Sequence, residues 1–270
     1  MPELPEVETT RRGVLPHLEN TVIRDIVVRD TRLRWPVPVK TLESLIGSRI
    51  STVERRAKYL YIVTDAGNII IHLGMSGRLQ VMPATTAPKK HDHVDIVLDS
   101  GEILRLNDPR RFGCVLFSKT PETHDLIRKL GPEPLSDDFD GDYLWHRARG
   151  KRVAIKPFIM DAQVVVGVGN IYASEALFMA GIHPLVSASK VSKARMAGLA
   201  DAVKVVLDRA IKAGGTTLRD FYGSDGSPGY FTQELAMYGR GGAPCPTCEK
   251  PITQRVIGQR STFYCTRCQH

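Results

Sequence analysis

The sequence lacks any apolar run close to the ~20 residues that a membrane-spanning helix requires. Near its start it also lacks the basic stretch followed by an apolar core that is typical of a secretory signal peptide. It contains neither an internal repeat nor a long low-complexity tract, which excludes a repeat architecture. For 270 residues we therefore expect a globular, cytoplasmic protein of two domains with a small appendage.

Cysteine and acidic residues are also scarce. Only Cys114 lies outside the last 26 residues, so the five cysteines do not form a disulfide scaffold, and Cys114 itself lies in an apolar run typical of a core. The chain has 29 acidic against 37 basic residues, a net charge of +8. This balance favours an anionic partner such as a nucleic acid, an anionic membrane or a phosphorylated substrate.

One glycine is missing where a dinucleotide-binding fingerprint would need it. The segment Gly167-Val168-Gly169-Asn170-Ile171-Tyr172 has tyrosine at the third glycine position, and no βαβ pattern surrounds it. A nucleotide cofactor is therefore not expected. A glycine turn that leads into a helix N-terminus remains, and such a turn can bind a phosphate.

Short segments rich in branched residues predict that residues 1–130 are mostly β. Turns such as Asp65-Ala66-Gly67 and Asp99-Ser100-Gly101 separate them and predict hairpins. Closely spaced short strands favour an antiparallel sandwich or a barrel. The predicted strands span residues 21–29, 58–64, 68–72, 94–98, 102–106 and 114–117.

The composition changes at residue 131, where a segment rich in proline, glycine and acid predicts a linker over 131–142. A helical domain follows over 143–235, with a short helix from about Asn170 to Gly181. Apolar residues from Leu199 to Ile211 recur with a period of 3.6, and this helix is expected to stop at Gly214-Gly215.

The last segment, 236–270, carries two Cys-x-x-Cys pairs separated by 16 residues. Each pair directs two thiolates at one ion, and two pairs complete a closed tetrahedron suited to structural zinc. We therefore predict one zinc ion per chain, held by Cys245, Cys248, Cys265 and Cys268. Five basic residues against one acid give this segment a net charge of +4, typical of either a phosphate-binding finger or a solvated basic surface.

The N-terminal residues allow two interpretations. If Met1 is removed, Pro2 supplies a secondary amine that can form a Schiff base with a sugar, and Glu3 and Glu6 follow within one helical turn. Proline and acids are equally typical of an ordinary helix start.

Three other features also leave alternatives open. The segment Asp108-Pro109-Arg110-Arg111-Phe112-Gly113 is either a structural turn or a device that fills a gap in a base stack. His91 and His93 would face the same way on a strand, but no third metal ligand has suitable spacing. The loop 221–230 is either a lid or a plain connection.

Ten segments, in order along the chain, closely resemble the formamidopyrimidine-DNA glycosylase family of bacterial enzymes that remove oxidised purines from DNA. The resemblance covers the chain from end to end, and so many motifs in order are highly specific. The segments are PELPEVET, RRAKYL, HLGMSG, KHDHVD, DPRRFG, LGPEPLSDDF, AIKP, VGVGNIYASEALF, GGTTLRDF and QRSTFYC.

The resemblance implies a fold and a set of roles. The fold is α+β and multidomain, with an N-terminal antiparallel β-sandwich with flanking helices, a helical helix–two-turn–helix domain and a β-hairpin zinc finger. Pro2 would be the nucleophile and Glu3 the general acid/base, while Lys58 would donate a proton in β-elimination and Arg260 would assist δ-elimination. The implied DNA contacts are His91, Arg110, Lys151, Lys156 and Asn170. The side chains implied to fill the hole left by the flipped base are Met75, Arg110 and Phe112. The residues implied to line the lesion pocket are Glu6, Arg219 and Tyr222.

The resemblance thus implies a monomeric, bifunctional glycosylase and abasic-site lyase that acts on 8-oxoguanine and formamidopyrimidines in duplex DNA. Leu4 favours this enzyme over a pyrimidine-directed sister that usually has glycine there. Arg219 stands where many members have lysine, so the sequence departs from the family's pattern in the lesion-capping loop. The alternatives are that sister enzyme and a non-catalytic zinc-finger DNA-binding protein.

Overall fold

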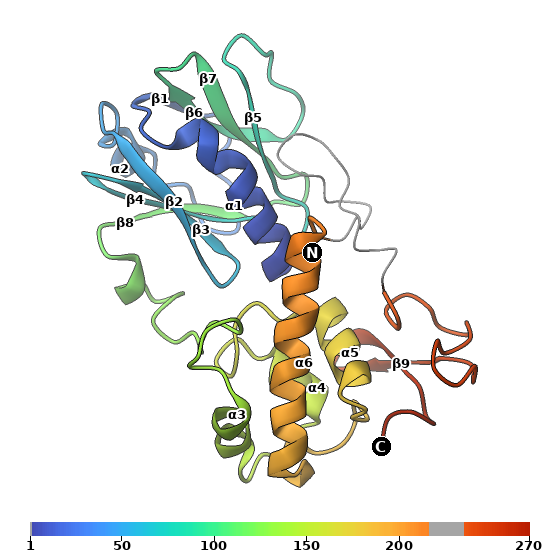
Figure 1. The fold of residues 1–270 in the computed structure, drawn as a ribbon. Coiled ribbons are helices and arrows are strands. Elements are labelled where there is room, and N and C mark those ends of the chain that lie inside the picture. The colour runs from blue at the N-terminus through green and yellow to red at the C-terminus, as the bar shows by residue number, and fades with distance from the viewer. Residues whose placement is uncertain (1, 216–234) are drawn as a thin grey trace. The chain divides into compact units, whose positions relative to one another are not determined.

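The computed structural model describes residues 2–215 and 235–270. The chain forms two compact units (Figure 1). Among the described residues, the first unit spans 2–128 and 213–215, and the second spans 129–212 and 235–270. The first break falls two residues before the domain end predicted at residue 130.

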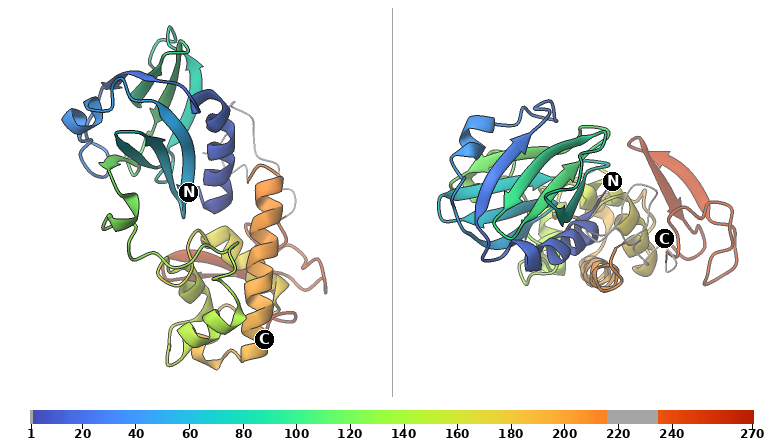
Figure 2. Two further views of the ribbon diagram at one scale, coloured as in Figure 1. Left: turned by 60° about the vertical axis from the view of Figure 1, so that its left-hand side comes forward. Right: turned by 90° about the horizontal axis from the view of Figure 1, so that it is seen from above.

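The first unit contains two four-stranded antiparallel sheets (Figure 2). Six of their strands match segments that the sequence predicts. The strands β2 and β5 were not predicted, because polar side chains interrupt both of them. The first sheet has the order β1 (Ile23–Val28), β6 (Asp92–Leu98), β7 (Glu102–Asn107) and β5 (Arg78–Pro83). The second has the order β2 (Ile50–Arg56), β3 (Tyr59–Thr64), β4 (Gly67–His72) and β8 (Cys114–Ser118).

One apolar core joins the two sheets into a sandwich. Branched side chains from every strand contribute to it, including Ile26 and Ile96 from the first sheet and Ile62 and Ile71 from the second. Burying apolar area from both sheets stabilises the unit by roughly 25 cal/mol per Å². The β-sandwich expected from the sequence is confirmed, and the barrel alternative is wrong because the two sheets remain separate.

The N-terminal helix α1 (Leu4–Leu18) is part of the same unit. Its residues Val7, Val14 and Leu18 join the core between the sheets. Glu8 on this helix accepts a 3.1 Å hydrogen bond from Arg55 Nε at the end of β2. Hydrophobic and ionic contacts thus fix the helix, and with it the N-terminal residues, on the sandwich. The short elements α2 (Val39–Glu43) and η1 (Pro121–Thr123) complete the unit.

The second unit is helical. The predicted stripe lies on α6, and its residues Leu199, Val203 and Leu207 are buried. Gly141 at the start of α3 packs so tightly that an added Cβ would lie 2.4 Å from Cα of Ala197. The helices are α3 (Gly141–Ala148), α4 (Ile155–Met160), α5 (Asn170–Met179), η2 (Ala188–Lys190) and α6 (Lys193–Lys212).

The finger belongs to this second unit. Its strands β9 (Thr253–Ile257) and β10 (Arg260–Tyr264) pair antiparallel around a two-residue turn, Gly258-Gln259. Both turn residues have positive φ, of 54° and 61°, as the right-handed twist of a two-residue hairpin favours. Phe178 of α5 packs against the small core of the finger, so the helices hold the finger in place. Among the described helices, none is both long and apolar enough to cross a membrane.

Candidate functional site

Pro2, the candidate nucleophile, lies outside the helix that follows it. Helix α1 begins at Leu4, has Glu3 at its N-cap, and contains its own early proline, Pro5. The backbone N–H of Glu3 donates to Glu6 Oε2 at 2.8 Å. The helix start is therefore complete without Pro2, although Pro2, Glu3 and Glu6 are all buried. The interpretation of this segment as an ordinary helix start is thus confirmed, with Glu3 and Glu6 in a capping box and Pro5 in the first turn, and Pro2 lies just before it.

Lys58 lies in the two-residue turn that joins β2 to β3. Ala57 before it has a φ of 57°, and its carbonyl accepts a 3.0 Å hydrogen bond from Arg55. The Lys58 side chain is half-buried. Burial, together with the positive charges of Lys58 and Arg34, lowers the pKa of His72 to about 4. Lys58 therefore lies in a cationic part of the first unit, beside a neutral imidazole.

Met75, Arg110 and Phe112 lie on two neighbouring loops of the first unit. Met75 is in the loop between β4 and β5, and the other two are in the loop between β7 and β8. Phe112 is 44% exposed, and the Arg110 guanidinium lies 5.0 Å from the centroid of its phenyl ring. An exposed aromatic with a cation over its face is suited to stacking against a base. The structure thus brings together the two loops that carry the three residues predicted to fill a gap in DNA.

His91 and His93 do not form a metal-binding pair. His91 precedes β6 and has a φ of 74°, so the alternation expected on a strand does not apply. His93 is buried, and its Nε2 lies 2.9 Å from the carbonyl oxygen of Asp108. Among the described residues, the cysteine quartet is the one group of three or more potential ligands close enough to hold a metal. His91 remains partly exposed, as a DNA contact would require.

Lys156 is almost fully buried, at 1% exposure, in the second unit. Its Nζ donates to Asn170 Oδ1 at 2.7 Å, to Thr262 Oγ1 at 2.9 Å and to the Ser261 carbonyl at 3.3 Å. Asn170 Nδ2 donates to the same carbonyl at 3.0 Å. These bonds tie the N-terminus of α5 to strand β10, directly beside the exposed residue Arg260. Nothing in the neighbouring residues indicates that this lysine is buried, since lysines are mostly exposed.

Lys151, by contrast, is exposed on the loop after α3. Its carbonyl accepts hydrogen bonds from Ser187 and Ser189, so the backbone is held while the side chain faces solvent. An exposed lysine on a fixed backbone is suited to contacting a phosphate.

The four cysteines of the finger fit a zinc ion. Their sulfur atoms all lie within 4.8 Å of one another, and those of Cys248 and Cys265 are 3.4 Å apart. A disulfide would need about 2.05 Å, whereas a tetrahedral site with Zn–S bonds of about 2.3 Å separates its sulfurs by roughly 3.8 Å. The predicted structural site is therefore formed by Cys245, Cys248, Cys265 and Cys268. Four protein ligands leave no open position, so the ion would supply folding energy and no chemistry.

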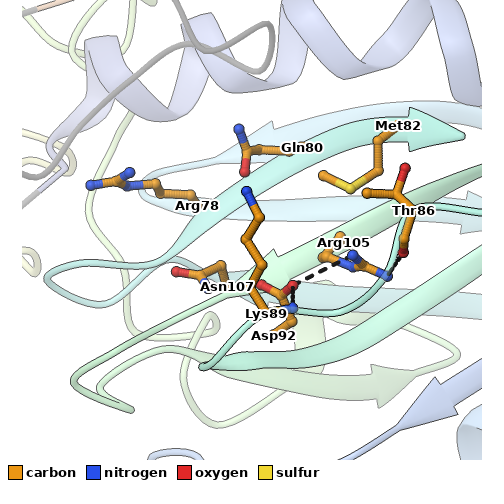
Figure 3. Close-up of a pocket in the computed structure, with 8 residues that line it drawn as sticks. All are labelled: Arg78, Gln80, Met82, Thr86, Lys89, Asp92, Arg105 and Asn107. Atoms are coloured by element: carbon orange, nitrogen blue, oxygen red, sulfur yellow. Dashed lines mark hydrogen bonds and ion pairs between the residues drawn. The ribbon is translucent and has the colours of Figure 1, made fainter.

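A cavity of about 380 Å³ lies on the first sheet, where Arg78, Gln80 and Met82 of β5 face Asn107 of β7 (Figure 3). Arg105, which lines the cavity, donates two 2.8 Å hydrogen bonds to the Asp95 carboxylate. None of the predicted site residues lines this cavity.

Two predicted site residues, Arg219 and Tyr222, lie outside the described residues, as does the loop 221–230. Gly215, which precedes them, is described and has a φ of 81°. A Cβ at Gly215 would lie 3.2 Å from Glu6 Oε1, so this glycine packs directly on the Glu6 carboxylate.

Three family models match the chain in order. They are the formamidopyrimidine-DNA glycosylase N-terminal domain over residues 1–115, the H2TH domain of the same glycosylase over 130–222, and the zinc finger found in FPG and IleRS over 242–270.

Full-length relatives agree with these matches. The chain is 56% identical to the formamidopyrimidine-DNA glycosylase of Stenotrophomonas maltophilia strain K279a over 269 residues, which covers all of both chains. It is 58% identical to that of Pseudomonas syringae pv. tomato, again over all of both chains.

Solved structures share the fold. The MutM (Fpg) protein of Thermus thermophilus matches with a TM-score of 0.89 and 35% identity, over 99% of this chain and 98% of the other. The G226P mutant of Lactococcus lactis FPG, crystallised with a Fapy-dG containing DNA, matches with a TM-score of 0.92 and 31% identity over all of both chains. The chain therefore belongs to the formamidopyrimidine-DNA glycosylase family.

Proposed function

We propose that this protein is a bifunctional DNA glycosylase and abasic-site lyase of base excision repair. It removes 8-oxoguanine and formamidopyrimidines from duplex DNA through a Schiff base on Pro2. The position of Pro2 carries this proposal. Once Met1 is removed, the nitrogen of Pro2 would be a secondary amine immediately before the capped helix start and next to Glu3, and no hydrogen bond of the cap involves that nitrogen.

The chemistry begins with attack of the Pro2 nitrogen on C1′ of the damaged nucleotide. The glycosidic bond breaks and the base leaves with a proton. The C1′–O4′ bond of the sugar then opens, O4′ takes a proton, and the Pro2 nitrogen becomes doubly bonded to C1′. Glu3, the residue next to Pro2, is proposed to transfer these protons. The resulting iminium withdraws electrons and makes the C2′ proton acidic. Loss of that proton expels the 3′ phosphate, and a second elimination expels the 5′ phosphate, so no metal or external oxidant is needed.

Two cations assist these eliminations in the proposal. Lys58 supplies a proton in the first step, from a turn that Arg55 fixes. Arg260 assists the second step and binds a phosphate from the start of β10. His91, Lys151 and the N-terminus of α5 at Asn170 contact further phosphates. The buried position of Lys156 supports a positioning role for it in place of a direct phosphate contact.

Extrusion of the lesion requires something to replace it in the stack, because unstacking a base costs a few kcal/mol. Met75, Arg110 and Phe112 are proposed to fill that space. The exposure of Arg110 and Phe112, and the position of the half-buried Met75 on the adjacent loop, support this role. Glu6, Arg219 and Tyr222 are proposed to line the pocket that receives the base. Since the relatives described above are bacterial, we propose that the protein works as a monomer on DNA in the bacterial cytoplasm.

Borohydride trapping tests the proposal. Duplexes containing 8-oxoguanine, thymine glycol or an abasic site are incubated with the protein and borohydride, and the covalent adduct is digested and mapped. We expect an adduct on Pro2 with the 8-oxoguanine and abasic duplexes. An adduct on another residue, or none, would refute the amine mechanism. Preference for thymine glycol would assign the protein to pyrimidine repair, and binding without any adduct would indicate a non-catalytic DNA-binding protein.

A further inference from the structure

The two loops that carry Met75, Arg110 and Phe112 pack backbone against backbone. Gly74 has a φ of 63°, and a Cβ on it would lie 2.3 Å from the carbonyl carbon of Phe112. No side chain could be accommodated at that position. The contact brings the loops together, but close packing alone does not fix the direction in which their side chains point.

Asp108 forms hydrogen bonds both within its own loop and to the neighbouring loop. Its side chain is completely buried, at 0% exposure. Its Oδ1 accepts from the Ser76 hydroxyl at 2.9 Å and from the Arg110 N–H at 3.3 Å, and its Oδ2 accepts from the Gly113 N–H at 2.8 Å. One carboxylate thus holds the residue after Met75, the backbone of Arg110 and the residue after Phe112.

The backbone of Asp108 is fixed in turn by the histidine segment. Its N–H donates to the His91 carbonyl at 3.0 Å, and its own carbonyl lies 2.9 Å from His93 Nε2. Within the described residues, Asp108 forms no ion pair, and the three donors that its carboxylate binds are all uncharged. A buried carboxylate is costly unless its hydrogen bonds are well made, so this one is expected to have a specific task.

We propose that Asp108 is the positioning residue that makes Met75, Arg110 and Phe112 a single rigid wedge for insertion into DNA. This inference rests on the proposed function. A wedge must be ordered before it enters the base stack, because ordering flexible loops at that moment would add conformational entropy to the cost of unstacking. Asp108 orders them in advance, through three bonds that reach both loops.

The substitution Asp108→Asn tests this role with little change in size. The amide keeps one oxygen acceptor, but its NH2 group would face either the Gly113 N–H or the donors on the Oδ1 side. We expect excision of 8-oxoguanine from duplex DNA to fall by about tenfold or more, because a displaced wedge disturbs the geometry of the extruded base. Cleavage of an abasic site in single-stranded DNA needs no wedge and should change little. Fluorescence of a 2-aminopurine opposite the lesion should report reduced insertion.

Two comparisons separate positioning from a general loss of stability. In a Met75→Ala/Arg110→Ala/Phe112→Ala background, Asp108→Asn should have no further effect on duplex excision. The control Asp95→Asn removes another buried carboxylate, which pairs with Arg29 and Arg105 in the same sandwich. It should lower the melting temperature and leave the ratio of duplex to single-strand activity unchanged.

Three outcomes would overturn the inference. They are wild-type excision by Asp108→Asn, an equal loss on duplex and single-stranded substrates, or an additive loss in the triple background. Failure of the proposed function would look different, since the wild-type protein itself would then form no Schiff base with any DNA.

Discussion

The backbone N–H of Glu3 donates a 2.8 Å hydrogen bond to the Glu6 carboxylate, which sets the direction of the chain between Pro2 and helix α1. Removing that acceptor in Glu6→Ala should cost about 1 kcal/mol of helix stability. We also expect Schiff-base formation to slow by about tenfold or more, because the nitrogen of Pro2 is no longer held in place. The measurement is the rate of borohydride trapping on abasic DNA. Glu6→Gln keeps an oxygen acceptor and should retain most of the trapping rate. An equal loss of rate in both variants would show that the negative charge of Glu6 matters and that its role as a hydrogen-bond acceptor does not.

Pro2→Gly keeps a free amine after Met1 removal but replaces the secondary amine of a ring with a flexible primary amine. We expect the trapping rate to fall by about a hundredfold, because both the geometry and the basicity of the nitrogen change. DNA affinity, measured by fluorescence anisotropy, should be unchanged. A parallel loss of affinity would point to a folding defect. A chain that retains Met1 is the control and should form no adduct, and full activity in that chain would contradict the amine mechanism.

His72 should remain neutral well below the pH at which an ordinary histidine gains a proton. Burial is the main cause of its pKa of about 4, and the charges of Lys58 and Arg34 add to it. The Gly74 N–H donates to His72 Nδ1 at 2.9 Å, and that nitrogen can accept only while it is unprotonated. In the unfolded chain His72 has an ordinary pKa of about 6.5, so as the pH falls the unfolded state binds the proton first. The contribution of the neutral His72 to folding stability therefore decreases as the pH falls from about 6.5 to about 4.

The full effect of this shift is roughly 3 kcal/mol. Urea unfolding gives the free energy of unfolding of the wild-type protein and of His72→Gln between about pH 7 and pH 4. The free energy should fall more steeply with decreasing pH in the wild-type protein, because glutamine keeps an acceptor but does not titrate. NMR of the imidazole gives an independent measurement. A ring that titrates near the ordinary value would contradict the expectation.

Lys156 and Lys151 allow a controlled comparison, because Lys156 is buried and Lys151 is exposed. Lys156→Met would leave two acceptors, Asn170 Oδ1 and Thr262 Oγ1, without this donor, at a cost of about 1–3 kcal/mol each, while the Ser261 carbonyl keeps its bond from Asn170 Nδ2. We therefore expect a drop of several degrees in melting temperature. Lys151→Met should leave the melting temperature unchanged and reduce the salt dependence of DNA binding by about 0.9 in slope. Unchanged stability in Lys156→Met would exclude the positioning role.

Parts of this molecule that depend on local spacing could be predicted from the sequence. Two Cys-x-x-Cys pairs bring four sulfurs together almost regardless of what surrounds them, and the finger is as expected. Strands with continuous branched residues, such as β3 and β4, were also predicted. In β2, by contrast, only Ile50 and Val53 are fully buried, and the strand is held in place by pairing with β3.

Long-range polar contacts could not be predicted in this way. Asp108 has the local pattern of the first residue of a turn, yet its carboxylate binds Ser76, 32 positions earlier in the chain. Lys156 binds residues 105 and 106 positions later. Neither partner can be identified from neighbouring residues, because tertiary packing brings them together. The one local indication for Asp108 is its position directly before a proline in a turn, because aspartate at that position commonly accepts hydrogen bonds from nearby backbone N–H groups.

Zinc removal should unfold the finger and weaken DNA binding while the sandwich remains folded. Cys245 and Cys265 are themselves part of the finger's small core with Met237, Ile252 and Phe263, and a two-stranded hairpin is at best marginally stable alone. Cys265→Ser should therefore lower zinc content, measured by elemental analysis, and release Arg260 from its fixed position. The salt slope of DNA binding should fall by about 0.9 for each phosphate that the finger no longer binds.

Cys114→Ala, which removes the buried cysteine of β8, is the control and should keep one zinc per chain. Undiminished affinity in a zinc-depleted protein would mean that the basic face of the finger is solvated and binds no phosphate.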